Sequence, residues 1–180
     1  THGPEVQGGV GGFAGMFDAS ALKGLDRPML ATSTDGVGTK VAIAQAIDKH
    51  DTVGLDLVGM VVDDIVVVGA KPLFMTDYIA CGKVVPERIA DLVRGIANGC
   101  EQTGTALVGG ETAEHPGLLG PDDYDLAGAA TGIVDAGRVL GCRQRRPPGD
   151  SHQHRQRGDQ SPRHAAARGL RRPLPLLRAA

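Results

Sequence analysis

The stretch Thr34–Lys40, TDGVGTK, brings a carboxylate, two glycines and an ammonium group close together. Gly36 and Gly38 leave the backbone bare, so that successive N–H groups can approach an anion. Lys40 adds a positive charge where a helix is expected to begin. Asp35 cannot cradle phosphate itself, but it can hold Mg²⁺, which prefers one or two carboxylates together with phosphate oxygens. The stretch predicts a site for a nucleotide phosphate and a metal ion; the alternative is a strand-to-helix turn with surface charges.

The glycine spacing does not match two common nucleotide motifs. The P-loop pattern GxxxxGK[ST] is absent, and TDGVGTK is no dinucleotide fingerprint. Residues Gly9–Ala14 match a loose GxGxxG/A, but no strand is expected before them. We interpret the glycine-rich residues 1–20 as a mobile loop that can act as a lid over a ligand.

A second acidic pair, Asp63 and Asp64, lies inside the apolar run VVDDIVVV. Charges in such a run are costly to bury unless they are paired or bound to metal. One of two adjacent helical residues can face solvent, which explains one aspartate more easily than both. We therefore expect a metal role for at least one of the pair.

A third cluster is Gly109–Gly117, GGETAEHPG. Its two leading glycines offer backbone access, and one helical turn would put Glu111 and Glu114 on the same face. The alternative is a turn with solvated acids. His115 precedes a proline and is interpreted as a loop residue. Three further acids are assigned mainly to a turn before a strand: Asp122, Asp123 and Asp125.

These candidates are carried by elements that alternate between strand and helix. Strands are expected at 28–33, 73–80, 106–108 and 124–134. Helices are expected at 39–49, 52–70 and 86–104. In the second helix the β-branched residues favour a strand, but the length and the lack of a turn signal favour a buried helix. The alternation predicts an α/β or α+β layer architecture.

Composition divides the chain near residue 141. Residues 1–141 contain 9 Lys and Arg against 19 Asp and Glu, whereas residues 142–180 contain 10 Arg and 2 Asp. We expect one folded domain at residues 21–141. The tail has no Val, Ile, Phe, Tyr, Lys or Glu and no periodicity, so we predict that it is disordered. A basic arm for nucleic acid is one interpretation; the abrupt change favours the other, a GC-rich gene read in a shifted frame.

The three cysteines form no CxxC and leave an odd count. This argues against a disulfide framework and a cysteine zinc site, and it favours a reducing compartment, the cytoplasm. No apolar run reaches the length of a membrane span. The first residues do not form a signal peptide. Because the chain begins at Thr1 with no Met, we expect its true start to be missing.

Together these segments resemble a known family. The resemblance is carried by TDGVGTK, the run His50–Lys83, LVGGETAEHPG and DYDLAGAATGIVD, in this order and spacing. They are similar to the N-terminal half of aminoimidazole ribonucleotide synthetase, also called phosphoribosylformylglycinamidine cyclo-ligase, over roughly residues 3–141. Thiamine-monophosphate kinase and selenophosphate synthetase share the acid-and-glycine pattern but not this run of motifs.

The resemblance implies a mixed β-sheet with helices packed on one side, closed into a barrel across a homodimer with ATP near the interface. It implies an ATP- and Mg²⁺-dependent ligase of de novo purine biosynthesis that converts formylglycinamidine ribonucleotide to aminoimidazole ribonucleotide. Phosphorylation would turn the formyl amide oxygen into a leaving group, an internal nitrogen would close the ring, and ADP and phosphate would be released. Neither a membrane nor nucleic acid is an expected partner.

The resemblance also implies roles for single residues. The catalytic set would be Asp35, Lys40 and Asp64. The nucleotide would be bound by Gly36, Gly38, Thr39, Lys40, Gly109, Gly110 and Glu111. The metal ligands would be Asp35, Asp64 and Glu111.

The chain departs from the family pattern in three places, one of which is the expected absence of the segment before residue 1 that contributes to the family's active site. Lys71 stands where the family usually has Glu. Residues 142–180 do not match the family's second domain, which carries an SSG-x-HSNG-like motif and helps to bind substrate. We therefore expect this chain alone to be inactive or nearly so. The alternatives are a non-catalytic dimerising nucleotide-binding remnant and a related ATP-dependent small-molecule kinase.

Overall fold

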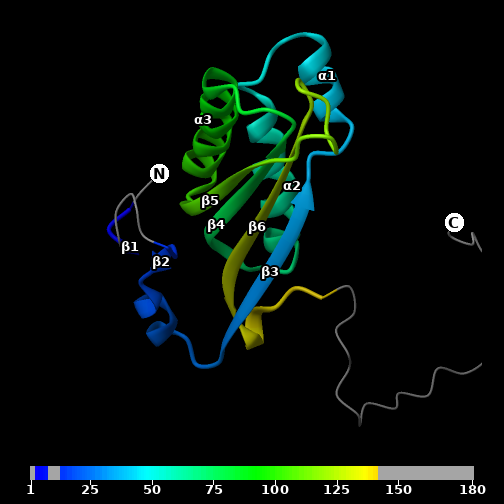
Figure 1. Cartoon of the computed structure of the whole chain (residues 1–180). Coiled ribbons are helices and arrows are strands. Elements are labelled where there is room, and N and C mark those ends of the chain that lie inside the picture. Colours follow the sequence, from blue (N-terminus) through cyan, green and yellow to red (C-terminus); the bar gives the residue numbers. More distant parts are fainter. Residues whose placement is uncertain (1–2, 8–12, 142–180) are drawn as a thin grey trace, which may run out of the picture. The chain divides into compact units, whose positions relative to one another are not determined.

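The structure is a computed structural model that describes residues 3–7 and 13–141 (Figure 1). The central part of the expected lid, residues 8–12, lies outside the described residues. So does the Arg-rich tail at residues 142–180, with the predictions of disorder and of a shifted reading frame. Within the described part, no helix combines the length and the apolar character needed to cross a bilayer.

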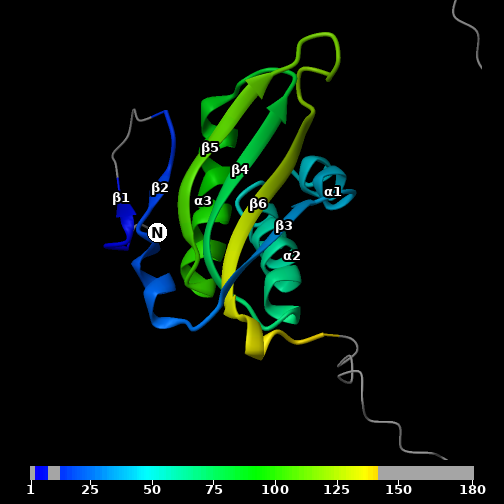
Figure 2. The ribbon, with the colours of Figure 1, turned by 90° about the horizontal axis from the view of Figure 1, so that it is seen from below.

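A mixed four-stranded sheet forms the centre of the described residues (Figure 2). Its strands are β3 (Pro28–Gly36), β4 (Lys71–Cys81), β5 (Ala106–Glu114) and β6 (Tyr124–Asp135). They lie in the order β3-β6-β4-β5, so β3 and β5 are the edge strands. The strand β6 is antiparallel to both of its neighbours, whereas β4 and β5 are parallel. A helix must connect the parallel pair, because a tight hairpin cannot.

Two long helices cover one face of this sheet, and a short helix follows β3. The helices are α1 (Lys40–Ala46), α2 (Val53–Val67) and α3 (Pro86–Thr103). The prediction of helices on one side of a mixed sheet is confirmed. The ends of α3 follow their sequence signals: Pro86 occupies the first turn, and Gly104 adopts a left-handed φ of 64° at the C-terminus.

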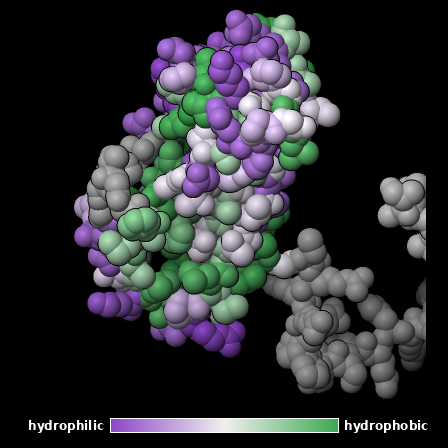
Figure 3. All heavy atoms as spheres, in the orientation of Figure 1, coloured by the Kyte–Doolittle hydropathy of each residue, from purple (hydrophilic) through white to green (hydrophobic). Residues whose placement is uncertain are grey.

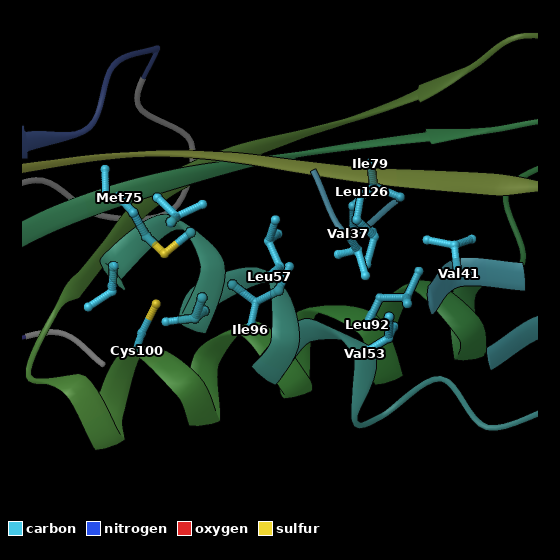
Figure 4. Packing of buried hydrophobic residues seen from close by; sticks show 14 of the residues in the cluster. Val37, Val41, Val53, Leu57, Met75, Ile79, Leu92, Ile96, Cys100 and Leu126 are labelled. Atoms are coloured by element: carbon cyan, nitrogen blue, oxygen red, sulfur yellow. The ribbon is translucent and has the colours of Figure 1, made fainter. Parts of the chain in front are cut away.

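The core lies between the covered face of the sheet and α2 and α3 (Figure 4). Its fully buried side chains include Leu57 and Ile65 on α2, Met75 and Ile79 on β4, Leu92 and Ile96 on α3, and Leu126 on β6. The two helices approach backbone to backbone at Gly54, where an added Cβ would collide with the main chain of α3. Helix α2 is therefore buried against both the sheet and α3, which explains why its sequence is rich in apolar and β-branched residues.

The other face of the sheet, which we call the open face, has no helix over it in the described residues. It presents Leu30 and Thr32 of β3, Tyr78 of β4, and small residues of β6 such as Ala127 and Ala129. Leu30 is 63% exposed and Tyr78 is 40% exposed. Figure 3 shows that apolar residues also gather on the surface where β3 begins and β6 ends.

The described parts of residues 1–20 contain two short strands that the sequence did not predict. Strand β1 (Val6–Gln7) pairs with β2 (Met16–Phe17), and the 3-10 helix η1 (Ala19–Gly24) follows. The ring of Phe17 lies 5.3 Å, centroid to centroid, from that of Phe74 on β4. A second 3-10 turn, η2 (Ala136–Arg138), follows β6.

The expected strand at residues 106–108 continues to Glu114, so GGETAE is part of β5. The idea that Glu111 and Glu114 share a helical face is therefore wrong. Along a strand, residues three apart point to opposite faces. The parallel pairing with β4 holds this segment extended, and the two glycines lie inside the strand instead of forming a turn.

Candidate functional site

The candidate site begins at the C-terminal end of β3. Asp35 and Gly36 are its last two residues. The Gly36 N–H donates to Asp35 Oδ1 at 2.7 Å. A Cβ on Gly36 would lie 3.2 Å from the Leu126 carbonyl oxygen, so the close approach of β6 favours glycine. The first glycine of TDGVGTK thus serves strand packing as well as backbone access.

The turn after β3 has the conformation that its glycines predict. The Val37 N–H donates to the Leu126 carbonyl oxygen at 3.2 Å, and the Val37 side chain is buried in the core. Gly38 has a φ of 64°, and the space where its Cβ would stand is open. Thr39 is the N-cap residue of α1, and its side chain makes no capping hydrogen bond. The backbone at residues 38–39 is therefore accessible from solvent.

Lys40 is the first residue of α1, and its Nζ lies 2.7 Å from Asp56 Oδ1 near the start of α2. Both side chains are about half exposed, at 48% and 44%. Ion pairs at such exposure stabilise a fold by about 1 kcal/mol at most. The ammonium group is thus oriented by Asp56 and remains free to meet an anion.

The acidic pair on α2 splits into two different roles. Ser33 Oγ donates to Asp64 Oδ2 at 3.1 Å, which ties Asp64 to β3. Ser33 and Asp35 point to the same face, and two residues along a strand span roughly 7 Å. Asp64 therefore lies on the same side of β3 as Asp35. Asp63 and Asp64 are both solvent-exposed, and the hydrogen bond from Ser33 is what distinguishes Asp64.

Gly109, Gly110 and Glu111 lie on β5, at the opposite edge of the sheet. Glu111 pairs with Tyr78 and points to the open face, whereas Asp35 points to the covered face. With β6 and β4 between them, the two edge strands are roughly 14 Å apart. Within one chain, therefore, the structure brings Asp35 and Asp64 to one edge but does not bring Glu111 to them.

The donor set at β3 fits a magnesium ion that is shared with a nucleotide. Mg²⁺ takes one or two carboxylates and completes its shell with phosphate oxygens and water. Asp35 and Asp64 supply two carboxylates on one side of β3. No group of three or more His, Cys, Asp or Glu among residues 3–7 and 13–141 is arranged to hold a metal alone. Glu111 does not fit as a third ligand from the same chain.

Asp77 is a candidate that the sequence reasoning missed. It points to the covered face between Met75 and Ile79, and it is paired with Gly128 on one side and Gly110 on the other. A Cβ on Gly110 would collide with its carboxylate. Burial raises the pKa of Asp77 to about 6. The alternation in FMTDYIA, which puts an acid in an inward position, was the signal that could have identified it.

Two tyrosine–histidine pairs lie on opposite faces. His50 Nδ1 lies 2.9 Å from the Tyr124 hydroxyl in the interior, and the sequence reasoning missed this pair. Tyr78 and His115 form the second pair, with the hydroxyl 3.0 Å from Nε2, on the open face. His115 thus follows β5 as an anchored residue, because its N–H also donates to the Cys81 carbonyl oxygen at 2.7 Å.

The remaining acids of the third cluster and of PDDYD have structural hydrogen bonds. The Val84 N–H donates to Glu114 Oε1 at 2.5 Å. Arg88 donates to the carboxylate and to the carbonyl of Asp122 at 3.2 and 3.0 Å. Asp123 and Asp125 accept from nearby backbone N–H groups. Asp122 and Asp123 lie in the turn before β6, as their sequence context indicates, whereas Glu114 ends β5 and Asp125 lies in β6.

One cavity of about 330 Å³ lies away from these residues. It is lined by the N-terminal segment, the start of β4 and the end of α3, including Phe17, Lys71 and Thr105. None of the predicted catalytic, nucleotide or metal residues lines it. The candidate site is instead the surface at the end of β3.

The sheet and its helices define an α+β fold with known relatives among solved structures. Thiamine-monophosphate kinase from Stenotrophomonas maltophilia K279a superposes with a TM-score of 0.57 at 20% identity, covering 76% of this chain and 39% of that one. PurL from T. maritima, complexed with AMPPCP, gives 0.52 at 19% identity, covering 63% and 18%. At these identities the likeness concerns the fold alone.

Sequence comparison gives the family. The model of the AIR synthase related protein, N-terminal domain, matches residues 17–134, and the chain belongs to this family. Phosphoribosylformylglycinamidine cyclo-ligase from Geobacillus kaustophilus is 57% identical over 140 residues, which are 78% of this chain and 40% of that protein. The enzyme of the same name from Oceanobacillus iheyensis is 58% identical over 140 residues, or 78% and 41%. The chain thus spans about two fifths of the length of these relatives, and the resemblance is confirmed.

Proposed function

We propose that this chain is the ATP-binding part of a phosphoribosylformylglycinamidine cyclo-ligase. The whole protein would convert formylglycinamidine ribonucleotide to aminoimidazole ribonucleotide and release ADP and phosphate. The observation that carries this proposal is the identity of 57–58% over 140 residues to enzymes of that name. The family match at residues 17–134 also spans every predicted site residue from Asp35 to Glu111. Turnover is proposed for a protein of the relatives' full length, and nucleotide binding for the chain itself.

In this proposal the turn at residues 36–40 receives the phosphates. Its open backbone at Gly38 and the N–H groups beside it would donate to phosphate oxygens. Lys40 would leave Asp56 for the nucleotide, because an exposed ion pair is weak and a polyphosphate offers more negative charge. Thr39, whose side chain makes no capping hydrogen bond, has its hydroxyl available in the same turn.

Asp35 and Asp64 would hold Mg²⁺ bound with the nucleotide. When bound, the ion supplies neutralisation of the phosphate charge that develops during phosphoryl transfer. Asp64 would be oriented for this by the hydroxyl of Ser33. Asp35 would be oriented by the adjacent Gly36 N–H. In this proposal both carboxylates would already be oriented by hydrogen bonds in the nucleotide-free chain.

In a homodimer, Glu111 of one copy could reach the nucleotide and metal ion bound by the other copy. The open face carries exposed Leu30 and Tyr78 beside small side chains, which suits a second copy of the sheet. Two such sheets joined at their edges would form a barrel, and β5 of one copy would then lie beside β3 of the other. This pairing would bring Glu111, with Gly109 and Gly110, toward the nucleotide held by the second copy. Free, buried Cys81 and Cys100 suit a reducing compartment such as the cytoplasm.

The fold alone also matches a small-molecule kinase, but only at 20% identity. A kinase would phosphorylate its substrate and release a phosphorylated product, whereas a cyclo-ligase releases free phosphate. Phosphate release by a full-length relative that carries residues 17–134 of this chain, in the presence of formylglycinamidine ribonucleotide, would distinguish the two.

The test on the chain itself is thermal stabilisation by Mg²⁺ and ATP. At a nucleotide concentration about 100-fold above Kd, binding should stabilise the fold by about 2.7 kcal/mol and raise Tm by several degrees. Asp35→Asn should abolish the shift. Asp63→Asn, which changes the neighbouring exposed acid on α2, is the control and should keep it. An unchanged Tm for the wild-type chain, or equal shifts in all three proteins, would contradict nucleotide binding at this site.

A further inference from the structure

We propose that His50 and Tyr124 form a latch that positions the phosphate-binding turn and α1 against the start of β6. The inference rests on the proposed function in one respect, since it takes residues 36–40 as the nucleotide turn. His50 is assigned here as a positioning residue: it acts on the turn through the backbone and does not touch the nucleotide itself.

Both ends of the turn-and-helix segment are tied to the first three residues of β6. Before α1, the Val37 N–H donates to the Leu126 carbonyl oxygen at 3.2 Å. After α1, His50 Nδ1 lies 2.9 Å from the Tyr124 hydroxyl. Tyr124 and Leu126 are two residues apart on one strand and both are buried. A rigid strand therefore fixes the segment from both sides.

Helix α1 has few other attachments among the described residues. It is seven residues long, with only Val41 and Ala44 buried. Its outward residues, Ile43 and Ile47, are each 62% exposed. An isolated helix of this length is not stable in water, because too few hydrogen bonds repay its nucleation. Besides the burial of Val41 and Ala44 and the ion pair of Lys40 with Asp56, α1 is held by the contacts at its two ends.

The environment of His50 gives the hydrogen bond a fixed direction. The imidazole is 8% exposed and lies edge-on to the Tyr124 ring, with centroids 5.5 Å apart at 75°. Its other nitrogen, Nε2, lies 3.1 Å from Asp48 Oδ1. In the neutral ring, Nε2–H donates to this carboxylate, which leaves Nδ1 to accept the Tyr124 O–H. Burial raises the pKa of the Tyr124 hydroxyl, so it stays a neutral donor.

The latch should affect the position of the phosphate-binding turn more than the stability of the whole fold. A shift of about 1 Å in the groups that bind a substrate can weaken their action a hundredfold. The apolar core includes the ring of Tyr124, which Tyr124→Phe keeps, but it does not include His50. Loss of the latch should therefore loosen residues 37–47 while the strands β4 and β5 remain protected.

Amide hydrogen exchange of the nucleotide-free full chain tests the latch directly. Tyr124→Phe removes only the hydroxyl and keeps the ring packing. It should speed exchange at residues 37–47 about tenfold, the effect of losing one buried hydrogen bond, while β4 and β5 should accelerate only as far as the measured loss of global stability requires. Tyr78→Phe is the matched control. It removes the other tyrosine–histidine hydrogen bond, on the open face, and should leave residues 37–47 unchanged.

A second pair of variants tests the role of His50. His50→Asn places an amide where Nδ1 stands, so it can keep the bond to Tyr124, whereas His50→Gln can keep only the contact to Asp48. Exchange at residues 37–47 should stay near the wild-type rate in His50→Asn and rise in His50→Gln. Exchange at residues 37–47 that is equal in the wild type and in all of these variants would overturn the latch.

The affinity for Mg²⁺ and ATP, measured by titration with the full chain, gives the functional consequence. Tyr124→Phe should weaken binding about tenfold, and the Tm of the free protein should fall by only a few degrees. Local loosening with an unchanged Kd would overturn the positioning role. If the wild-type chain binds no ATP, the proposed function fails, but the exchange experiment still decides whether the latch exists.

Discussion

The two faces of the sheet differ in how far their apolar side chains are buried. The covered face is closed by α2 and α3, and its residues Ile79 and Leu126 are fully buried together with Leu57 of α2. The open face carries Leu30 at 63% exposure and Tyr78 at 40%. The covered face holds the fold together, whereas the open face is built from side chains that gain little until something else covers them. If the proposed homodimer forms through the open face, substitutions on the two faces should separate the stability of the fold from association.

The largest difference is expected for leucines on opposite faces. Leu57→Ala leaves a cavity in the core and should lower the free energy of unfolding by about 3–5 kcal/mol. Leu30→Ala removes an exposed side chain and should cost less than about 1 kcal/mol in the monomer. Chemical denaturation followed by circular dichroism gives both values.

A charge at the same open-face position tests association. Leu30→Asp should leave the monomer folded but reduce the dimer fraction measured by sedimentation, because a carboxylate would be buried without a pair. If Leu30→Asp unfolds the chain as strongly as Leu57→Ala does, the two faces are not separable in this way.

The next largest difference in unfolding free energy is expected between substitutions of two glycines, Gly54 and Gly109. A Cβ on Gly54 would collide with the backbone of α3, which cannot yield as a flexible side chain can. Gly54→Ala should therefore destabilise the fold by about 3 kcal/mol, despite a helix-propensity gain of about 1 kcal/mol. Gly109, on the open face, has open space at its Cβ position. Gly109→Ala should change the unfolding free energy by less than about 0.5 kcal/mol. Similar losses in both variants would show that the open side of β5 is also packed.

Asp77 is a carboxylate between apolar residues of the covered face. Its burial should make the stability of the fold depend on pH. Burial raises its pKa from 3.8 to about 6 in the folded state. A raised acid pKa means that the folded state holds the proton more tightly, so stability is highest below about pH 4 and falls as the pH rises to about 6. The full shift corresponds to about 3 kcal/mol, and we expect about 2 kcal/mol because the carboxylate is partly exposed.

Asp77→Asn should remove this dependence. The variant should be more stable than the wild type by about 2 kcal/mol at pH 7.5 and equally stable near pH 4. Urea denaturation at both pH values provides the comparison. A variant that is less stable at pH 7.5 would mean that the ionised carboxylate has a stabilising contact.

Sequence reasoning succeeded where the signals are local. Pro86 and Gly104 mark the ends of α3, and the long apolar run was correctly interpreted as the helix α2. It failed where the conformation of a segment is determined by contacts with residues distant in the sequence. Residues 109–114 form a strand because β4 pairs with them, although Gly-Gly suggested a turn. The contact of Lys40 with Asp56 and the inward position of Asp77 likewise depend on how helices pack, which residue spacing alone does not reveal.

The smallest contrast compares neighbours on β3 that point to opposite faces. Ser33, which is buried, donates to Asp64 Oδ2 at 3.1 Å, and Thr32, on the open face, donates to the Ala130 carbonyl oxygen at 3.1 Å. Ser33→Ala should cost about 1 kcal/mol, because a buried donor to a carboxylate is lost. Thr32→Val keeps the branched shape and should cost about 0.5 kcal/mol or less.

The same two variants distinguish an effect on stability from an effect on nucleotide binding. Ser33→Ala also frees Asp64, so it should weaken the stabilisation by Mg²⁺ and ATP, whereas Thr32→Val should leave that shift unchanged. Thermal melts with and without nucleotide measure both effects in one experiment. An equal nucleotide shift in the two variants would mean that Asp64 does not depend on Ser33 for its orientation. In that case the hydrogen bond from Ser33 would not be needed to orient Asp64. Asp35, at the start of the turn, would then be the carboxylate that is oriented without it.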